Sequence, residues 1–174
     1  MPCSNVPDSK TDPPVEGVRL VTLNEDTLGQ VVEIERASYR SPWRREHFRF
    51  EIHENRWAVN LVARQGDVVL GYACVWELKG ELKINNLAVR VDYRRRGLAR
   101  WMLGRILAGA RERGCTVATL EVRTSNRAAI RLYEAHGFVE IGRRKGYYRA
   151  ESEDAIVMQA ALEPPVARDG SGTL

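Results

Sequence analysis

The sequence predicts an α/β protein built on one central mixed β-sheet of about seven strands, with helices on both faces of the sheet. The first observation is an alternation of patterns: segments with apolar residues at every second position and segments with a helical apolar stripe follow in the order βααβββαβαββ. The second is composition, because 174 residues with 44% hydrophobic and 29% charged suit one globular domain. Collagen-like, disulfide-rich and wholly disordered classes are excluded.

The folded domain is expected over residues 17–162. Prolines separated by polar residues predict a disordered N-terminal arm over residues 1–16, and a Glu-Pro-Pro run opens a flexible tail over residues 163–174. No apolar run approaches the ~20 residues of a membrane helix, and the first residues lack the basic and apolar regions of a secretory signal. Three widely spaced cysteines without zinc-ligand spacing indicate reduced thiols, no metal site and a cytoplasmic location.

The first half of the domain should contain two helices and four strands. Val18–Leu23 alternates as a strand does. A helical stripe over Asp26–Tyr39 ends at Ser41-Pro42-Trp43, and a short second helix is expected over Arg44–His53. Strands are then expected at Trp57–Ala63, Val68–Glu77 and Leu82–Val91.

The second half should contain two helices and three strands. Gly97–Arg113 is the clearest helix, because one face is apolar and Gly114 follows as a C-cap. Val117–Val122 is rich in β-branched and apolar residues, which favours a strand. A helix over Asn126–His136 and two last strands at Phe138–Ile141 and Ala155–Met158 complete the order.

The turn before the clearest helix combines small residues with positive charge. Eight arginines against two acids lie between Arg90 and Arg113. A helix N-terminus offers free N–H groups and a positive dipole end, and Gly97 and Ala99 leave room for a phosphate beside the backbone. The spacing is neither that of a P-loop nor that of a dinucleotide-binding turn. From the residues alone, a plain turn with solvated arginines or a nucleic-acid patch stays open.

Several motifs resemble one family. Arg94-Arg95-Arg96-Gly97-Leu98-Ala99, after a Leu-Ala-Val strand, resembles the acetyl-CoA-binding signature of the GNAT superfamily of N-acetyltransferases. Motifs that resemble its protein N-terminal acetyltransferase branch are Leu120–Asn126, Ala128–Ile130, Leu132–Glu134 and Gly137-Phe138. Motifs that resemble the RimI subgroup, which acetylates the N-terminal alanine of a small-subunit ribosomal protein, are Ser41-Pro42-Trp43, Arg143-Arg144, Tyr147-Tyr148 and Glu153–Met158. Together they cover about residues 17–160 in the order of the family, which is far more specific than a lone glycine signature.

The resemblance implies a GNAT fold whose central strands splay into a wedge for acetyl-CoA. Backbone groups of the Leu-Ala-Val strand would pair with the pantetheine arm and hold the thioester, and N–H groups from Arg95 to Arg100 would hold the pyrophosphate. The implied cofactor residues are Leu87, Ala88, Val89, Arg94, Arg95, Arg96, Gly97, Leu98, Ala99, Arg100, Asn126 and Tyr133. Asn126 is also a favourable helix N-cap residue, and the two roles are compatible.

The resemblance also implies two catalytic residues. Glu121 matches the general base, which takes a proton from an α-amino group of pKa about 7.7–8.0 before the amine attacks the thioester directly. Tyr133 matches the acid that protonates the leaving CoA thiolate, and neither a metal nor a covalent enzyme intermediate is implied. From the residues alone, Glu121 could belong to a polar strand face with Thr119 and Arg123, and Tyr133 could be a core aromatic.

The acceptor peptide is implied to enter between a loop at Trp43 and a loop at Lys145–Tyr148. Tyr147 and Tyr148 point to opposite faces if extended, so only one should line the groove. Arg149 stands where RimI sequences often have proline, which leaves other acceptors open: many protein N-termini, or a lysine. A silent acetyl-CoA-sensing or partner-binding domain is the non-enzyme alternative. Neither nucleic acid nor a membrane is expected as a partner.

Overall fold

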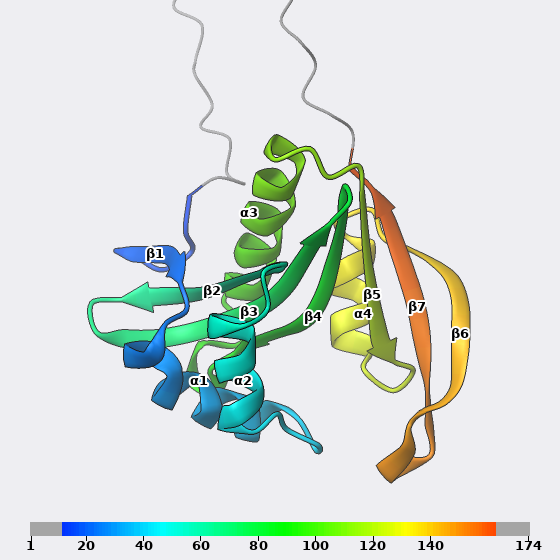
Figure 1. The fold of residues 1–174 in the computed structure, drawn as a ribbon, viewed down its shortest axis with the longest axis horizontal. Helices are drawn as coiled ribbons and strands as arrows, with labels where there is room; N and C mark the ends of the chain where they lie inside the picture. Colours follow the sequence, from blue (N-terminus) through cyan, green and yellow to red (C-terminus); the bar gives the residue numbers. More distant parts are fainter. Residues whose placement is uncertain (1–11, 163–174) are drawn as a thin grey trace, which may run out of the picture.

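The computed structural model describes residues 12–162, which form one seven-stranded sheet with four α-helices around it (Figure 1). The order of elements is the predicted one, and the mixed α/β architecture is confirmed. The elements are β1 (Val18–Thr22), α1 (Glu25–Ser38), α2 (Arg45–His53), β2 (Ala58–Gln65), β3 (Val68–Leu78), β4 (Glu81–Val89), α3 (Leu98–Glu112), β5 (Val117–Arg123), α4 (Arg127–Glu134), β6 (Val139–Tyr148) and β7 (Glu153–Ala161).

The sheet has the strand order β1-β2-β3-β4-β5-β7-β6, and β4 and β5 are its parallel pair. Their pairing begins at Glu81↔Val117 and stops at Ile84↔Leu120, although both strands continue beyond that point. Figure 1 shows β4 and β5 together at one end and apart at the other. The sheet therefore opens into the predicted wedge in its middle.

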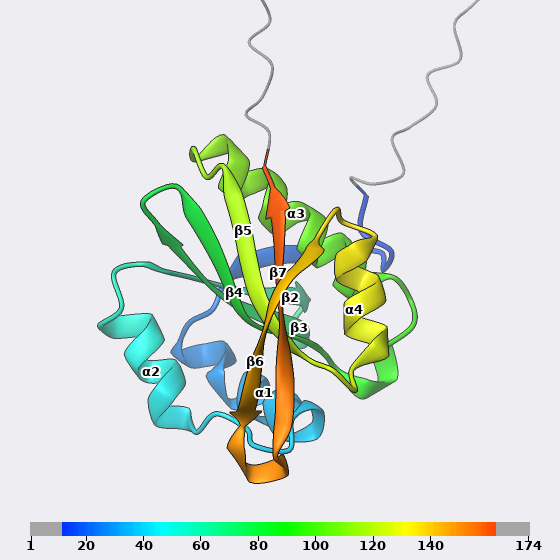
Figure 2. The ribbon, with the colours of Figure 1, turned by 90° about the vertical axis from the view of Figure 1, so that its right-hand side faces the viewer.

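Helices cover both faces of the sheet (Figure 2). Leu98 and Met102 of α3 and Ile130 of α4 belong to one apolar cluster, together with residues from β3, β4, β5 and β7. Leu28 of α1 and Phe48 of α2 belong to a second cluster, which covers the opposite face. Burial of these two apolar stripes is the main force that holds the helices on the sheet.

Three helices begin at residues that suit a helix N-terminus. Asn24 forms a capping box with Thr27 at the start of α1. The side chain of Asn126 accepts a hydrogen bond of 3.1 Å from the N–H of Ala129, so the predicted cap on α4 is present. Gly97 precedes α3 with φ of +82°, a conformation that glycine adopts without strain. Gly97 and Asn126 both line a cavity beside Leu87 of β4, so the starts of α3 and α4 lie at the wedge.

The last hairpin differs from the prediction. β6 continues to Tyr148, so the tyrosine pair lies at the end of a strand, and the connection to β7 is the short turn Arg149–Glu151. The prediction ended this strand at Ile141 because apolar alternation stops there. β6 is an edge strand that is exposed along nearly its whole length, so pairing with β7 maintains it without an apolar pattern.

Residues 12–16, which the sequence assigned to the arm, lie against the domain. Val15 packs on the cluster under α3, and its carbonyl accepts a hydrogen bond of 3.3 Å from Val18. Gln65 donates a hydrogen bond of 2.7 Å to the carbonyl of Glu16. The rest of the arm and the C-terminal tail lie outside the described residues. Within residues 12–162, each helix is too short or too polar to cross a membrane.

A substitution at Gly71 of β3 tests the packing between the sheet and α3. A Cβ atom at this position would lie 2.9 Å from the carbonyl oxygen of Ala88 and 3.0 Å from the sulfur of Met102. Gly71→Ala should therefore lower the free energy of unfolding by about 1–3 kcal/mol through overpacking. Gly142→Ala is the control, because a Cβ atom there meets nothing within 4 Å. Equal urea midpoints for the two variants would contradict this packing.

Candidate active site

Two adjoining cavities open at the wedge, one of about 740 Å³ and one of about 530 Å³. The larger cavity lies between the α1–α2 loop and the β6–β7 hairpin, and the smaller lies between β4 and the starts of α3 and α4. Six residues line both of them: Ser38, Tyr39, Leu87, Asn126, Ala129 and Tyr133. These residues form the junction at which molecules bound in the two cavities could meet.

The smaller cavity collects most of the predicted cofactor residues. Its walls include Leu87, Ala88, Val89, Arg94, Arg95, Gly97, Leu98, Ala99, Arg100, Asn126 and Tyr133. Arg96 is not among them, and its guanidinium lies over the ring of Tyr93 at 5.1 Å. No side chain caps α3, so its first N–H groups remain available at the cavity, where an anion is favoured.

Arg94 has a structural task that the sequence did not reveal. Its Nε donates to the carbonyl of Val89 at 3.0 Å, and its Nη2 donates to the hydroxyl of Ser38 at 2.9 Å. These bonds tie the turn before α3 to the end of β4 and to α1. Arg94 thus helps to fix the shape of the smaller cavity, and its guanidinium is used in these two hydrogen bonds.

Glu121 is the first residue of β5 beyond the last pair with β4. Its side chain is 8% exposed and lines the larger cavity, so it does not belong to a freely solvated polar face. The ammonium of Lys83 donates to one carboxylate oxygen, and the guanidinium of Arg144 lies 3.3 Å from the other. Lys83 was not among the expected site residues, and Arg144 was named only as part of the Arg143-Arg144 motif, without its contact to Glu121.

Tyr133 combines the two roles that the sequence left open. Its ring packs edge-on against Phe138 at 5.7 Å, and the residue also lines both cavities. Burial raises the pKa of its hydroxyl above the usual value, so the group remains protonated at neutral pH. Tyr133 can therefore act as a proton donor at the junction.

The predicted acceptor residues all line the larger cavity, but not in the predicted way. Both Tyr147 and Tyr148 line it, with ring centroids 5.2 Å apart and an interplanar angle of 89°. The expectation that only one would do so was wrong, because the pairing of β6 with β7 shifts register between Arg144 and Tyr148, and Gly146 has φ of +58°. This irregularity breaks the strict alternation of faces. Trp43 lines the opposite side.

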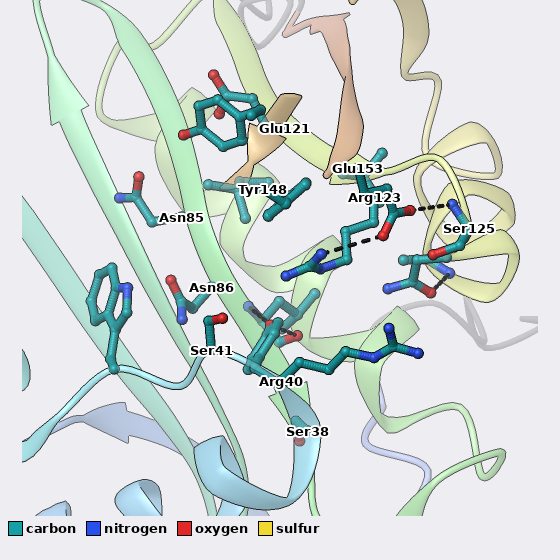
Figure 3. Close-up of a pocket in the computed structure, with 18 of the residues that line it drawn as sticks. Ser38, Arg40, Ser41, Asn85, Asn86, Glu121, Arg123, Ser125, Tyr148 and Glu153 are labelled. Carbon is teal, nitrogen blue, oxygen red and sulfur yellow. Dashed lines mark hydrogen bonds and ion pairs between the residues drawn. The ribbon is translucent and has the colours of Figure 1, made fainter. Parts of the chain in front are cut away.

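A charged network that the sequence did not reveal supports this wall (Figure 3). Arg123 contacts the carboxylates of Glu151 at 3.2 Å and Glu153 at 3.3 Å, and its guanidinium lies 3.8 Å from the ring centre of Tyr148. Hydrogen bonds from Ser125 are the main cause that lowers the pKa of Glu153 to about 2. The network links the end of β5 to the hairpin that carries the tyrosines.

Glu35 of α1 is a second missed group. It is 1% exposed, and its carboxylate accepts hydrogen bonds from the N–H of Trp43 at 2.7 Å, from the hydroxyl of Tyr72 and from the amide of Asn86 at 3.3 Å. Burial raises its pKa. In the sequence, this carboxylate lies next to the apolar stripe of the first helix, and that position could have indicated that it is buried. Glu35 holds the α1–α2 loop, and with it Trp43, against the sheet.

Tyr39 stands at the junction, where it occupies main-chain groups predicted for the cofactor. Its hydroxyl donates to the carbonyl of Leu87 at 3.0 Å and accepts from the N–H of Leu87 at 3.4 Å. A molecule that accepts a hydrogen bond from the N–H of Leu87 therefore competes with this hydroxyl.

Histidine, cysteine, aspartate and glutamate form no group of three or more suited to a metal ion within residues 12–162. Cys74 and Cys115 are both buried and free. Burial raises the pKa of each thiol, and neither residue lines a cavity described above. Both fit the predicted role of small buried residues.

Comparisons with known proteins agree with this geometry. A family model described as "Acetyltransferase (GNAT) family" matches residues 28–138. The ribosomal protein bS18-alanine N-acetyltransferase of Salmonella typhimurium is 37% identical over 138 residues, which cover 78% of this chain and 92% of that protein.

Solved structures point the same way. The crystal structure of the ribosomal-protein-S18-alanine N-acetyltransferase from Escherichia coli aligns with a TM-score of 0.78 and 30% identity, covering 87% of this chain and 97% of that one. The NatC complex bound to Gag peptide and CoA aligns with a TM-score of 0.73 and 22% identity over 84% of this chain and 99% of that one, which shows likeness of fold alone.

Proposed function

The chain belongs to the GNAT acetyltransferase family and is an N-acetyltransferase, and we propose that its acceptor is the N-terminal alanine of a small-subunit ribosomal protein. The junction shared by the two cavities carries this proposal. An acyl donor could bind in one cavity and a protein N-terminus in the other, and the reacting groups of the two could meet at the junction. The activity named for the similar bacterial proteins supports the choice of acceptor.

Members of this family use acetyl-CoA, and the smaller cavity fits that donor. The start of α3 has free N–H groups and positive charge nearby, which suit a pyrophosphate. The strand residues Leu87, Ala88 and Val89 line the same cavity, and their backbone suits an amide-containing arm. Asn126 would contact the arm near the junction while its side chain also caps α4.

Glu121 and Tyr133 divide the proton transfers between them. Glu121 takes a proton from the acceptor amine, directly or through a water molecule. Acetyl-CoA supplies the activated acetyl group, which the neutral amine attacks directly. Tyr133 then donates its proton to the departing sulfur, and since a thiol has a pKa of only about 8.5, this acid supplies a modest part of the acceleration.

A peptide panel tests the acceptor. Peptides that begin with alanine, serine, glycine or methionine, and an Nα-blocked peptide with an internal lysine, are incubated with acetyl-CoA and read by mass spectrometry. The proposed function predicts the highest kcat/KM for the alanine peptide. Equal rates for every first residue would indicate a general N-terminal acetyltransferase, and acetylation of the lysine alone would refute an Nα-acetyltransferase.

Tyr39→Phe should increase the affinity for acetyl-CoA about two- to tenfold, because the main-chain groups of Leu87 lose a competing hydrogen-bond partner. Isothermal titration calorimetry with acetyl-CoA measures the change. Tyr93→Phe is the control, since Tyr93 lines the same cavity and lies under Arg96 instead. A loss of affinity in Tyr39→Phe alone would show that the hydroxyl helps to bind the donor.

A further inference from the structure

We propose that Lys83 is a positioning residue that holds Glu121 at the wedge and, through its charge, makes the acceptor bind as a neutral amine. The proposal rests on the function proposed above, because it needs an amine acceptor beside Glu121. Lys83 belongs to none of the motifs that carried the family resemblance. Its role is read from the contacts in the larger cavity.

The strand register directs Lys83 at Glu121. Lys83 of β4 pairs with Thr119 of β5, one pair before the strands separate after Ile84↔Leu120. Because side chains alternate along a strand, Thr119 and Glu121 share a face of β5, and Lys83, the partner of Thr119, lies on that face of the sheet as well. The ammonium thus reaches along the opening of the wedge to the carboxylate. The two side chains are 27% and 8% exposed, so the pair is partly shielded from water.

Glu121 lies between two positively charged side chains. One carboxylate faces two cations, Lys83 on one oxygen and Arg144 on the other. Arg144 is 55% exposed, so solvent and salt weaken its effect more than that of Lys83. The other titratable and charged groups that line this cavity or border Lys83 are Glu35, Tyr39, Arg40, Glu81, Arg123, Tyr133, Tyr147, Tyr148 and Glu153.

Most of these other charges already have partners. Arg123 is held between Glu151 and Glu153, Glu35 is buried with three donors, and Glu81 accepts a hydrogen bond of 2.6 Å from Thr119. The charged groups in direct contact with Glu121 are its two cations, Lys83 and Arg144.

A positive environment opposes a protonated acceptor. A like charge within ~4–6 Å lowers the pKa of an amine, and here it offsets the opposite effect of the Glu121 carboxylate. A protein α-amino group with a pKa of about 7.7–8.0 would then be largely neutral near pH 7 when it is bound. Lys83 would thus favour the neutral nucleophile, and Glu121 takes the proton that the nitrogen releases when the amine attacks the thioester.

The pH dependence of kcat tests the proposal, because kcat reports the protonation states of the bound complex. Lys83→Met should move the acid limb of kcat upward by about one pH unit or more, so that the deficit is about tenfold or greater below pH 7 and shrinks at alkaline pH. Lys83→Arg should keep the acid limb of the wild type. Arg144→Met, which removes the exposed cation from the same carboxylate, should move it much less.

Two results would overturn the proposal. One is an unchanged acid limb in Lys83→Met with kcat lowered equally at every pH, and the other is a change in KM alone. Thermal stabilisation by acetyl-CoA verifies that each variant is folded, and Lys83→Gln replaces Lys83→Met if the latter is not. The profiles use the peptide that the wild type acetylates fastest. If the fastest peptide does not begin with alanine, the proposed acceptor is refuted but the proposed role of Lys83 is not. If the wild type acetylates no amine, both the proposed function and the role of Lys83 are overturned.

Discussion

Glu121→Gln should lower kcat/KM for an alanine-first peptide by about 10²–10⁴-fold, the usual contribution of a positioned general base. Glutamine has nearly the same shape but cannot take a proton from the acceptor amine. The carboxylate is 8% exposed at the cavity, beyond the last β4–β5 pair, where an amine at the junction can reach it. Steady-state rates at saturating acetyl-CoA measure the loss.

The control for this variant is Glu81→Gln. Glu81 lies on β4 at the paired end of the wedge, where it accepts a hydrogen bond from Thr119, and it does not line the larger cavity. Its kcat/KM should stay within about twofold of the wild type, as expected for a surface change away from the chemistry. Full activity in Glu121→Gln with intact folding would remove Glu121 from the proposed mechanism.

Gly97→Val should abolish most of the stabilisation that acetyl-CoA gives the protein. In the wild type, a ligand at 100 times its dissociation constant should add about 2.7 kcal/mol to the free energy of unfolding. Gly97 has φ of +82° at the start of α3, so a β-branched residue would distort the turn whose N–H groups are proposed to hold the pyrophosphate. Differential scanning fluorimetry with and without acetyl-CoA reads the effect.

Gly114→Val separates backbone strain from loss of the binding site. Gly114 follows the other end of α3 with φ of +93°, and a Cβ atom there meets nothing within 4 Å. Both variants should melt earlier than the wild type, but only Gly114→Val should retain the shift that acetyl-CoA produces. Equal shifts in the two variants would exclude this turn as the pyrophosphate site.

Periodicity predicted the order of the elements because each buried element has one apolar face. Leu98 and Met102 of the helical stripe are buried, and so are Ala118, Leu120 and Val122 on one face of β5. Apolar periodicity did not predict the full length of β6, because an exposed edge strand needs no apolar alternation. The length of that strand depends on its partner β7, which a local pattern does not contain.

The residues of the candidate site also fall into those that the sequence indicated and those that depend on long-range contacts. Glu121 and Tyr133 were found through a family resemblance, since each residue alone also fitted a plain structural role. Lys83 was missed because it lies 38 positions from Glu121, and their contact depends on the register of β4 and β5. Tyr39 was missed for the same reason, as its partner Leu87 is 48 positions away.

The two-cavity site is tested most directly by a crystal structure of the enzyme with a bisubstrate compound. In this compound, CoA is joined through its acetyl group to a peptide that begins with alanine. The diphosphate should contact the N–H groups at the start of α3, and the acetyl group should lie at Leu87 in the junction. The peptide should leave through the larger cavity, past Glu121 and Trp43. A diphosphate bound elsewhere, or a peptide that leaves along the smaller cavity, would contradict the site.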